Sequence, residues 1–444
     1  MKVRFLLGAL LIMKFIADLH IHSKYSRATS KDMDVENLNK WAKIKGIKVL
    51  GTGDFTHALW IKELKSKLEP AEPGLFKIKK KIRSSLINNN WLPNNNHHDE
   101  GTRFLLSSEI SCIYSKNNRT RKIHVVVLAP DFSTIEKINT RLGWIGNLKS
   151  DGRPILGLDA KELAKIVLNT SKDCFIIPGH IWTPWFSLFG SMSGFDSIEE
   201  CFDEYAKYIY AGETGLSSDP DMNWRLSALD NIALVSNSDA HSPAKIGREA
   251  NIFDTDLSYA GIVEAIKSKD PQKFLETIEF FPEEGKYHYD GHRRCKVCLT
   301  PQESKKLKNI CPECGKPLTI GVLHRVDDLA DRKDGEKPAQ VIPFRKTIPL
   351  EEIISEAKGV GPASKAVRKE YKNLIKRLGS EFKILLDVSP EQIEQASSAE
   401  IAEGVRRVRQ GKVSIEPGYD GEFGRVKIFK DEERGGFSKQ ASLF

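Results

Sequence analysis

Short apolar segments alternate with amphipathic ones through the first 285 residues, and this alternation most constrains the fold. The pattern predicts strands at residues 15–23, 47–57, 104–114, 122–130, 174–182 and 232–242. It predicts helices at residues 33–46 and 160–173, the first of which ends at Gly46. Strands that alternate with helices are typical of a parallel α/β sheet or barrel.

Side chains that bind metals follow or end these apolar segments. They are His20, His22, Asp54, His57, Glu109, His124, His180, Asp239 and His241. For each histidine alone, a satisfied core or surface residue is the favoured interpretation over a metal ligand. Together they predict several divalent cations at the carboxyl ends of the strands, where barrel enzymes place their chemistry, because unpartnered buried imidazoles and carboxylates are costly.

The mixed set of ligands suits Zn²⁺, Mn²⁺ or Fe²⁺, with Mg²⁺ at the more carboxylate-rich positions. His20 and His22 are expected to bind one ion, since alternate residues of a strand share a face. Such a site suits phosphate ester hydrolysis, in which divalent cations activate water and neutralise charge. Asp239, His241 and Glu109 are the predicted catalytic residues, with Asp239 the first choice for an indispensable one.

Four of the seven cysteines form a second cluster, with the spacing C-x2-C-x12-C-x2-C. Cys295, Cys298, Cys311 and Cys314 are predicted to hold one structural Zn²⁺ with no open position. An odd number of cysteines with one tight cluster is typical of a reducing cytoplasm and not of a disulfide framework. The second pair, CPECG, resembles a zinc-ribbon knuckle. Ribbons bind DNA, RNA or protein, and the basic residues around this one favour nucleic acid.

The last third of the chain is predicted to be mainly helical. Two helices flank the turn Gly359-Val360-Gly361, which loosely resembles a helix–hairpin–helix element. Such a turn can point backbone N–H groups at a DNA phosphate. Gly359, Gly361, Lys365, Arg368 and Lys369 are therefore candidate DNA-binding residues, although an ordinary helix pair with a solvated basic face explains the pattern equally well. The net charge of +8 permits a nucleic-acid partner without demanding one.

The two ends of the chain carry signals of their own. Residues 1–12 combine a basic start with a short apolar run, and either an upstream start codon before Met13 or an export signal explains them. The final QASLF resembles the peptide by which bacterial repair proteins bind the β sliding clamp, with Gln440, Leu443 and Phe444 as the contacts. The resemblance implies a bacterial replication or repair setting.

These boundaries divide the 444 residues into five parts. They are a non-native or disordered extension (1–13), a metal-dependent phosphoesterase barrel (14–285), a four-cysteine zinc module (286–325), a helical DNA-binding domain (326–430) and a flexible tail (431–444). A cytoplasmic, nucleoid-associated monomer is expected, with no membrane span.

The ordered set DLHIHS, GTGDFTH, Glu109, His124, His180 and NSDAHSP resembles the polymerase and histidinol phosphatase (PHP) superfamily. The resemblance implies a distorted (β/α)7 barrel with a trinuclear site that hydrolyses phosphoesters. Many members carry another ligand shortly after H-x-H, which Arg27 and Ala28 cannot replace. Many also read D-H where this chain has Asp54, then Phe55, with His57 further on. These departures favour fewer than three tightly bound ions.

The order of barrel, cysteine module and helical segment resembles the endonuclease Q family from about residue 14 to 430, with GTGDFTH, SDAHSP and KGVGPAS as linked phrases. The resemblance implies a DNA repair endonuclease. It would cut 5′ of uracil, hypoxanthine, xanthine and abasic sites in duplex DNA, and it would leave 3′-hydroxyl and 5′-phosphate ends. It would need Mg²⁺ or Mn²⁺ for catalysis, with Zn²⁺ in the cysteine module and in the barrel.

Recognition of a deaminated base in a duplex requires that the base leave the stack. Trp182, Trp185 and Phe186, next to His180, could line a base pocket or wedge the duplex, and they could equally be core aromatics. Two other functions remain open. A small-molecule phosphatase of the histidinol-phosphatase kind explains the barrel but leaves the last third without a role. A DNA-binding accessory protein with a decayed site explains the missing ligand but not the retained ones.

Overall fold

The first part of the chain folds around a ring of seven strands in a computed structural model that describes residues 12–82 and 101–430. In ring order the strands are β1 (Ile12–Asp18), β2 (Val49–Gly51), β5 (Arg103–Lys116), β6 (Arg119–Ala129), β8 (Phe175–Pro178), β9 (Ala211–Glu213) and β10 (Ala233–Val235). Ladders join β1 to β8 in this order and β9 to β10. The N–H of Ile181, just after β8, donates to the carbonyl of Glu213 at the end of β9. A bridge between Ile21 and Ala240 closes the ring after β10.

The ring is distorted because β6 runs antiparallel to both of its neighbours. A turn at Asn117 and Asn118, both with positive φ, joins β5 directly to β6. A two-residue turn can only produce an antiparallel pair, whereas parallel strands need a long crossover. The short strand β7 (Ile155–Leu156) adds to β5.

Further strands extend the sheet on both sides of the ring. They are β3 (Leu68–Pro70) and β4 (Phe76–Ile78) beyond β5, and β11 (Ala250–Asp256), β12 (Phe274–Glu279) and β15 (Phe344–Lys346) beyond β1. No strand of this region was predicted after residues 232–242, yet β11 and β12 follow. In β11 and β12, charged residues such as Asp254 and Glu276 interrupt the apolar pattern that marks a buried strand.

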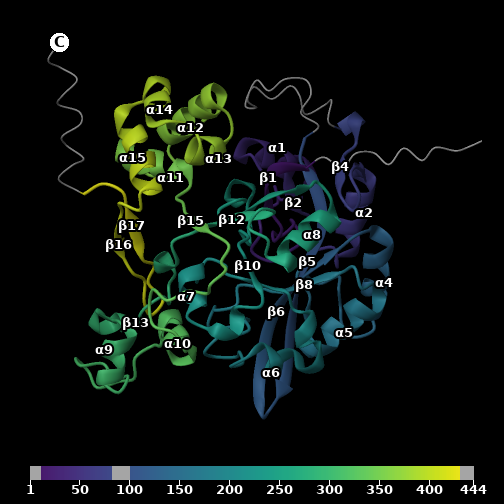
Figure 1. Cartoon of the computed structure of the whole chain (residues 1–444), viewed down its shortest axis with the longest axis horizontal. Helices are drawn as coiled ribbons and strands as arrows, with labels where there is room; N and C mark the ends of the chain where they lie inside the picture. The colour runs from purple at the N-terminus through teal and green to yellow at the C-terminus, as the bar shows by residue number, and fades with distance from the viewer. Residues whose placement is uncertain (1–11, 83–100, 431–444) are drawn as a thin grey trace, which may run out of the picture.

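Helices cover the outside of the ring, and Figure 1 shows α2, α4 and α5 together on one side of it. They are α1 (Val35–Lys45), α2 (Ala58–Lys67), α4 (Phe132–Leu142), α5 (Ala160–Thr170), α6 (Ile198–Phe202), α7 (Pro220–Trp224) and α8 (Tyr259–Ser268), with short 3-10 turns at η1 (Asp203–Tyr208), η2 (Ser227–Leu229), η3 (Pro243–Lys245) and η4 (Pro282–Glu284). Both predicted helices are confirmed. Asp34 caps α1, and Gly46 ends it in the left-handed conformation that glycine adopts most easily.

The cysteine-rich module lies beside the barrel. It contains β13 (Asp290–His292), η5 (Arg293–Cys295), β14 (Val297–Leu299) and α9 (Pro301–Lys306), and α10 (Val322–Leu329) follows it. Val322 and Val326 of α10 are buried in the barrel core, and Arg325 donates to the carbonyl oxygens of Phe189 and Phe195. The predicted boundary at residue 325 therefore falls inside a helix that packs on the barrel.

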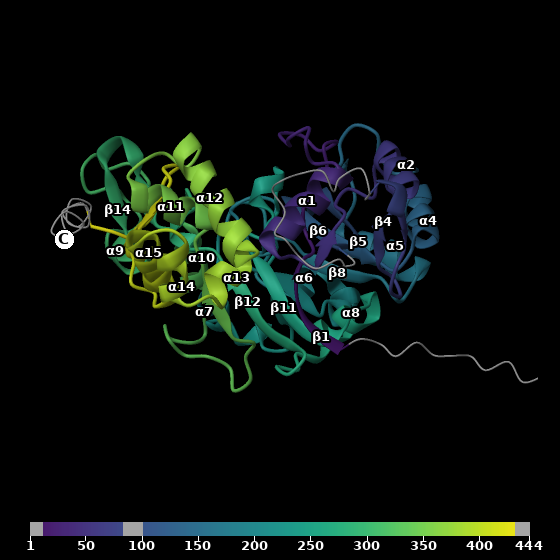
Figure 2. The same cartoon turned by 90° about the horizontal axis from the view of Figure 1, so that it is seen from above.

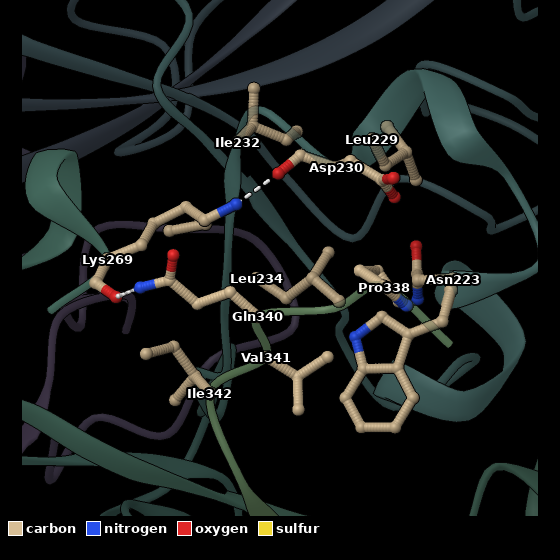
Figure 3. Close-up of a pocket in the computed structure, with 12 residues that line it drawn as sticks. Asn223, Leu229, Asp230, Ile232, Leu234, Lys269, Pro338, Gln340, Val341 and Ile342 are labelled. Carbon is tan, nitrogen blue, oxygen red and sulfur yellow. Dashed lines mark hydrogen bonds between the residues drawn. The ribbon is translucent and has the colours of Figure 1, made fainter. Parts of the chain in front are cut away.

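The segment after α10 also packs on the barrel. Figure 3 shows residues 338–342 running past Lys269 and Ile232, where Gln340 donates to the carbonyl of Lys269 at 3.2 Å. Beyond this segment, β15 pairs in parallel with β12. The segment therefore contacts the barrel and leads into the strand at the edge of its sheet.

The remaining elements form a helical bundle with its own core (Figure 2). They are α11 (Leu350–Lys358), α12 (Lys365–Leu378), α13 (Glu381–Leu386), α14 (Pro390–Ala396) and α15 (Ala399–Arg409), followed by the antiparallel pair β16 (Ser414–Glu416) and β17 (Arg425–Lys427). A buried ion pair of 2.8 Å between Lys45 of α1 and Glu381 joins this bundle to the barrel. Within residues 12–82 and 101–430, no helix is long and apolar enough to cross a membrane.

Candidate active site

Two groups of potential metal ligands meet at one rim of the strand ring. The first is His20, His22, Glu109 and Asp239, and the second is Glu109, His124 and His180. In each group, the ligand atoms lie within 4.8 Å of one another. Glu109 belongs to both groups, so it would contribute to holding a cation in either one. Six of the nine predicted ligands are thus brought together by the fold.

His20 shows how closely the first group fits a cation. Its Nε2 atom is buried, and no group in the described parts of the chain forms a hydrogen bond with it. Glu109 Oε1 lies 3.8 Å from this nitrogen and Asp239 Oδ1 lies 3.7 Å from it, which is too far for a hydrogen bond. Ligands that each lie about 2.1 Å from one ion are separated by roughly this distance. The orphaned nitrogen and the two carboxylates therefore fit a shared cation.

His22 and Asp239 complete the first group. His22 Nε2 lies 2.9 Å from Asp239 Oδ1 and 3.4 Å from Glu109 Oε2. The second group is equally close: Glu109 Oε1 lies 2.6 Å from His124 Nδ1 and 3.1 Å from His180 Nε2.

Glu109 and His124 differ from the other ligands in their position. They lie inside β5 and β6 and not at the ends of strands. The long β5–β6 hairpin extends past the rim, so residues in the middle of these two strands reach the level at which the other strands end.

Three of the histidines in the ligand groups also have a partner at the ring nitrogen that faces away from the other ligands, and this partner orients the ring. His20 Nδ1 lies 3.0 Å from both oxygens of Glu213, and His22 Nδ1 lies 3.1 Å from Asp54 Oδ1. His180 Nδ1 lies 3.0 Å from the hydroxyl of Thr183. Metal-binding histidines usually have such a partner, which fixes the ring and its tautomer.

Glu213 was missed by the sequence analysis, although it is fully buried at the centre of this arrangement. It also accepts hydrogen bonds from the backbone N–H of His180 and from the side-chain amide of Asn237, both at 2.9 Å. The available signal was its place at the end of the short segment Ala211–Glu213, which turned out to be a strand of the ring.

Three predicted ligands lie outside both groups. Asp54 accepts hydrogen bonds at Oδ2 from the backbone and hydroxyl of Ser23 and from the hydroxyl of Ser26, at 2.7, 2.6 and 2.9 Å. His57 precedes α2 and stacks on Tyr25 with ring centroids 4.4 Å apart. His241 packs against His22 at 4.5 Å, and its Nδ1–H donates to the carbonyl of Asp239 at 2.7 Å.

The site concentrates carboxylate charge. Burial alone would raise the pKa of Glu109, but the facing histidines, His124 first, hold it well below its usual range. Burial alone would lower the pKa of His20, but Glu213 and Glu109 raise it well above its usual range. Only neutral imidazole binds a metal, so divalent cations in this site would compete with protons for the histidine nitrogens.

Backbone strain marks the same residues. Asp54, His180 and Asp239 have positive φ angles of 50°, 28° and 47°. Residues other than glycine rarely adopt these angles, and such strain persists where the surrounding structure fixes it, commonly at functional sites. Gly215 accommodates one of them, because a Cβ atom there would lie 2.5 Å from the Cβ of His180.

The aromatic residues after His180 divide into two kinds. Trp182 is a core residue, because its ring is buried against Phe189 and its Nε1 donates to Asn223 at 2.7 Å. Phe186 has its ring 4.8 Å from that of His124, and Trp185 is 41% exposed. Of the three predicted base-contacting residues, only Trp185 and Phe186 are therefore placed to meet a substrate.

Comparison with known proteins identifies the family. The crystal structure of the lesion-specific endonuclease PfuEndoQ from Pyrococcus furiosus has a TM-score of 0.81 and 32% identity, and the match covers 97% of this chain and all of that one. The chain belongs to the endonuclease Q family. A second endonuclease Q structure, solved with a 27-mer duplex substrate that carries an abasic lesion at the active site, matches at 32% identity with a TM-score of 0.79, over 95% of this chain and 98% of that one.

Two proteins also match the chain in sequence. The uncharacterized protein YqxK of Bacillus subtilis is 29% identical over 93% of this chain and 99% of its own length. The uncharacterized protein MJ0043 of Methanocaldococcus jannaschii is 33% identical over 62% of this chain, but the match spans only 34% of that protein. Family models described as PHP-associated and as the MJ0043 C-terminal domain match residues 222–271 and 349–412.

In the cysteine module of this chain, the set of potential zinc ligands differs from the predicted four cysteines at one position. The group that could hold a metal is His292, Cys295, Cys311 and Cys314. Burial alone would raise the pKa of the Cys311 thiol, but N–H groups of Cys314 and Glu313 lower it to about 7, which favours the thiolate that binds zinc.

Cys298 lies outside this group. It is in β14 opposite Gly291, and burial, Asp290 and Glu303 raise its pKa to about 11. The strand pairing explains the difference, because it directs residue 298 toward α9 while the preceding turn leaves Cys295 beside the other thiols.

The two helices around the glycine turn are confirmed as α11 and α12. Gly359 ends α11 with a φ of 62°, and Ser364 caps α12. Lys365, Arg368, Lys369 and Lys376 line a shallow groove on the exposed face of α12. The predicted clamp contacts Gln440, Leu443 and Phe444 lie outside the described residues.

Proposed function

We propose that this protein nicks duplex DNA at the phosphodiester on the 5′ side of damaged bases. The substrates are deaminated bases (uracil, hypoxanthine and xanthine) and abasic sites, and the products carry 3′-hydroxyl and 5′-phosphate ends. One observation carries the proposal: a matching endonuclease Q structure holds a duplex with an abasic lesion at its active site. The two ligand groups that share Glu109 are consistent with phosphodiester hydrolysis at that place.

The residues of the site have separate roles in this proposal. His20, His22, Glu109 and Asp239 would hold one divalent cation, and Glu109, His124 and His180 would hold a second. Such cations activate water and neutralise charge on the phosphate and on the leaving oxygen. Either Zn²⁺ or Mn²⁺ suits this donor set, with Mg²⁺ as the catalytic alternative.

Residues next to the ligands keep them in place and handle protons. Glu213 and Asp54 fix the rings of His20 and His22. A carbonyl oxygen only accepts hydrogen bonds, so His241 carries its proton on Nδ1, where it donates to Asp239. Its Nε2 therefore keeps a lone pair and can accept a proton during hydrolysis.

The damaged nucleotide would leave the stack to reach the site. Phe186 lies beside the ligand His124, and the ammonium of Lys122 lies 5.3 Å from its ring. Trp185 is exposed and its ring lies 5.7 Å from that of Tyr287. Exposed rings next to a catalytic centre provide stacking surfaces for an extruded base or for the strand it leaves.

The basic face of α12 is proposed to contact the phosphate backbone. Replacing Lys365, Arg368 and Lys369 by Ala should weaken binding to damaged and undamaged duplexes alike, by about tenfold to a hundredfold at about 100 mM salt. The slope of log affinity against log salt should fall by about 0.9 for each phosphate that the variant no longer neutralises. Fluorescence anisotropy over a salt series measures both quantities.

A matched triple variant controls for net charge. Lys137 and Arg141 of α4 and Lys165 of α5 lie on the other side of the barrel from α12 (Figure 1). Their replacement by Ala removes the same charge and should leave the salt slope unchanged. An equal loss of affinity in both triple variants would show that α12 makes no specific contact.

The C-terminal QASLF is proposed to bind the bacterial β sliding clamp. Deleting residues 440–444 should abolish clamp binding in a pull-down with purified β clamp, while the nicking of short free duplexes stays within about twofold. A substitution in the spacer, Ser442→Ala, serves as the control and should retain binding. Clamp binding by the truncated protein would refute the assignment.

The enzymatic class is tested by comparing two substrates. A duplex with one abasic site should be nicked in the presence of Mn²⁺ and left intact after treatment with EDTA. Release of phosphate from small phosphomonoesters, without nicking, would instead assign the barrel to a phosphatase.

A further inference from the structure

One arginine reaches the active site from a segment to which no function has been assigned above. Arg153 lies in the tight segment 151–154, which crosses the rim of the barrel between α4 and β7. Its Nη1 atom lies 3.0 Å from Glu109 Oε2, the carboxylate shared by both ligand groups. An arginine among candidate metal ligands is unexpected, because its positive charge repels a nearby cation.

The backbone on both sides of Arg153 is fastened to three parts of the barrel. The N–H of Gly152 donates to the carbonyl of Tyr25 at 3.0 Å, and the Gly152 carbonyl accepts from Thr56 at 2.9 Å. The carbonyl of Pro154 accepts from the N–H of Ser111 at 3.0 Å. The backbone that carries Arg153 is therefore held at the rim, and Glu109 is the protein contact of its guanidinium among the described residues.

This segment also fits closely over Asp54. A Cβ atom at Gly152 would lie 2.3 Å from Asp54 Oδ2 and 2.5 Å from Ser26 Oγ, so only glycine fits there. Asp54 Oδ2 already accepts three hydrogen bonds from Ser23 and Ser26, and its Oδ1 faces His22. The oxygens of Asp54 are thus occupied by protein donors, and no third ligand group forms around it among residues 12–82 and 101–430.

The guanidinium of Arg153 also has N–H groups that are available for further hydrogen bonds. A guanidinium carries five N–H donors, and within the described residues only the contact with Glu109 occupies one of them. The side chain is 27% exposed, so one part of it faces Glu109 and another is open to solvent at the rim. A planar guanidinium matches two oxygens of a phosphate, which makes arginine the usual residue for this contact.

We infer that Arg153 binds the non-bridging oxygens of the scissile phosphodiester and supplies the positive charge that a third cation would otherwise supply. This inference rests on the proposed function and adds a substrate-binding residue to it. Arg153 would hold the phosphate against the two cation positions through its free donors while Glu109 holds the guanidinium. The alternative is a purely structural role, in which Arg153 only orients Glu109.

The test compares three variants in single-turnover nicking of a duplex with one abasic site. Arg153→Ala should lower the rate by about a hundredfold. Arg153→Lys should recover part of that loss, because lysine restores the positive charge but not the planar set of N–H donors that matches two phosphate oxygens. The control is Arg27→Ala. Arg27 pairs with Asp151 in the same segment at 3.3 Å, but its side chain is 76% exposed, and its loss should change the rate less than threefold.

Two readouts separate phosphate binding from a structural role. Elemental analysis should find the same metal content in wild type and in Arg153→Ala. With a phosphorothioate at the scissile position, the rate ratio of the two diastereomers should differ between wild type and Arg153→Ala. Sulfur weakens the hydrogen bond from the guanidinium to the oxygen it replaces, and the variant has no such bond to lose, whereas effects of sulfur on the cations are common to both proteins.

Three results would overturn the inference. They are a wild-type nicking rate in Arg153→Ala, a rate loss that comes with lost metal and is restored by excess Mn²⁺, and an unchanged diastereomer ratio. The absence of any nick with the wild-type protein would instead overturn the proposed function, and this inference with it. Thermal unfolding of each variant identifies any that fail to fold, and Arg153→Lys then replaces Arg153→Ala in the diastereomer comparison.

Discussion

Replacing Asp239 by Asn is expected to lower single-turnover nicking by at least about a thousandfold, which corresponds to roughly 4 kcal/mol of transition-state stabilisation. Asp239 Oδ1 lies 2.9 Å from His22 Nε2 and 3.7 Å from His20 Nε2, so the amide removes one of the two carboxylates in the first ligand group. Asn has the same shape, and the fold should persist. Binding of the damaged duplex, measured by anisotropy, should change less than about threefold.

An acid outside the site provides the control. Asp256 ends β11 and takes part in neither ligand group, so Asp256→Asn should nick at the wild-type rate. Wild-type nicking by Asp239→Asn would remove Asp239 from the site. Loss of both nicking and duplex binding would mean that the substitution damages the fold or the DNA surface.

The second large effect is expected in the cysteine module. Structural zinc contributes on the order of 10 kcal/mol of binding free energy, and a small module of this kind depends on it for folding. Cys311→Ser removes a buried thiolate from the group of four and should release the metal. Limited proteolysis should then cut within residues 290–318, whereas the barrel should stay resistant because it has a separate core.

A pair of substitutions tests the composition of that group. The structure places His292 with the three cysteines and leaves Cys298 outside. His292→Ala should therefore lose metal to a competing chelator much faster than wild type, and Cys298→Ser should behave as wild type. The spacing of the two cysteine pairs predicts the opposite result, with faster metal loss from Cys298→Ser than from His292→Ala. Metal content per chain, measured for both variants under one chelator concentration, distinguishes the two ligand sets.

The fold was largely predictable because local signals agreed with it. The helix over residues 33–46 has a capping Asp34, apolar residues at helical spacing and a terminal glycine, and the structure has α1 at Val35–Lys45. The antiparallel direction of β6 was not predicted, since the direction of a strand depends on its pairing and not on its composition. The strands β11 and β12 were missed because their charged residues at the sheet edge hide the apolar period.

The site was predictable in its chemistry but not in its assignment of roles. His20, His22 and Asp239 stood out because paired ligands follow apolar segments. Asp54 carries the same signal, yet its oxygens accept hydrogen bonds from Ser23 and Ser26 and face His22. Only the three-dimensional structure shows this.

Glu213 and Arg153 carried at most a weak pattern. Glu213 ends a strand of only three residues, and Arg153 lies in an irregular segment. Both act through residues distant in the chain, since Glu213 contacts His20 and Arg153 contacts Glu109. Contacts between segments this far apart depend on the closed ring, which a single sequence does not reveal.

This chain is proposed to cut the DNA strand next to a damaged base. The most direct measurement uses a 5′-labelled duplex with one deoxyuridine or one deoxyinosine, the purified protein and Mg²⁺ or Mn²⁺, with products resolved on a denaturing gel. We expect a single nick immediately 5′ of the lesion, absent from the undamaged duplex. Intact duplex under all these conditions, with hydrolysis of small phosphomonoesters instead, would contradict it.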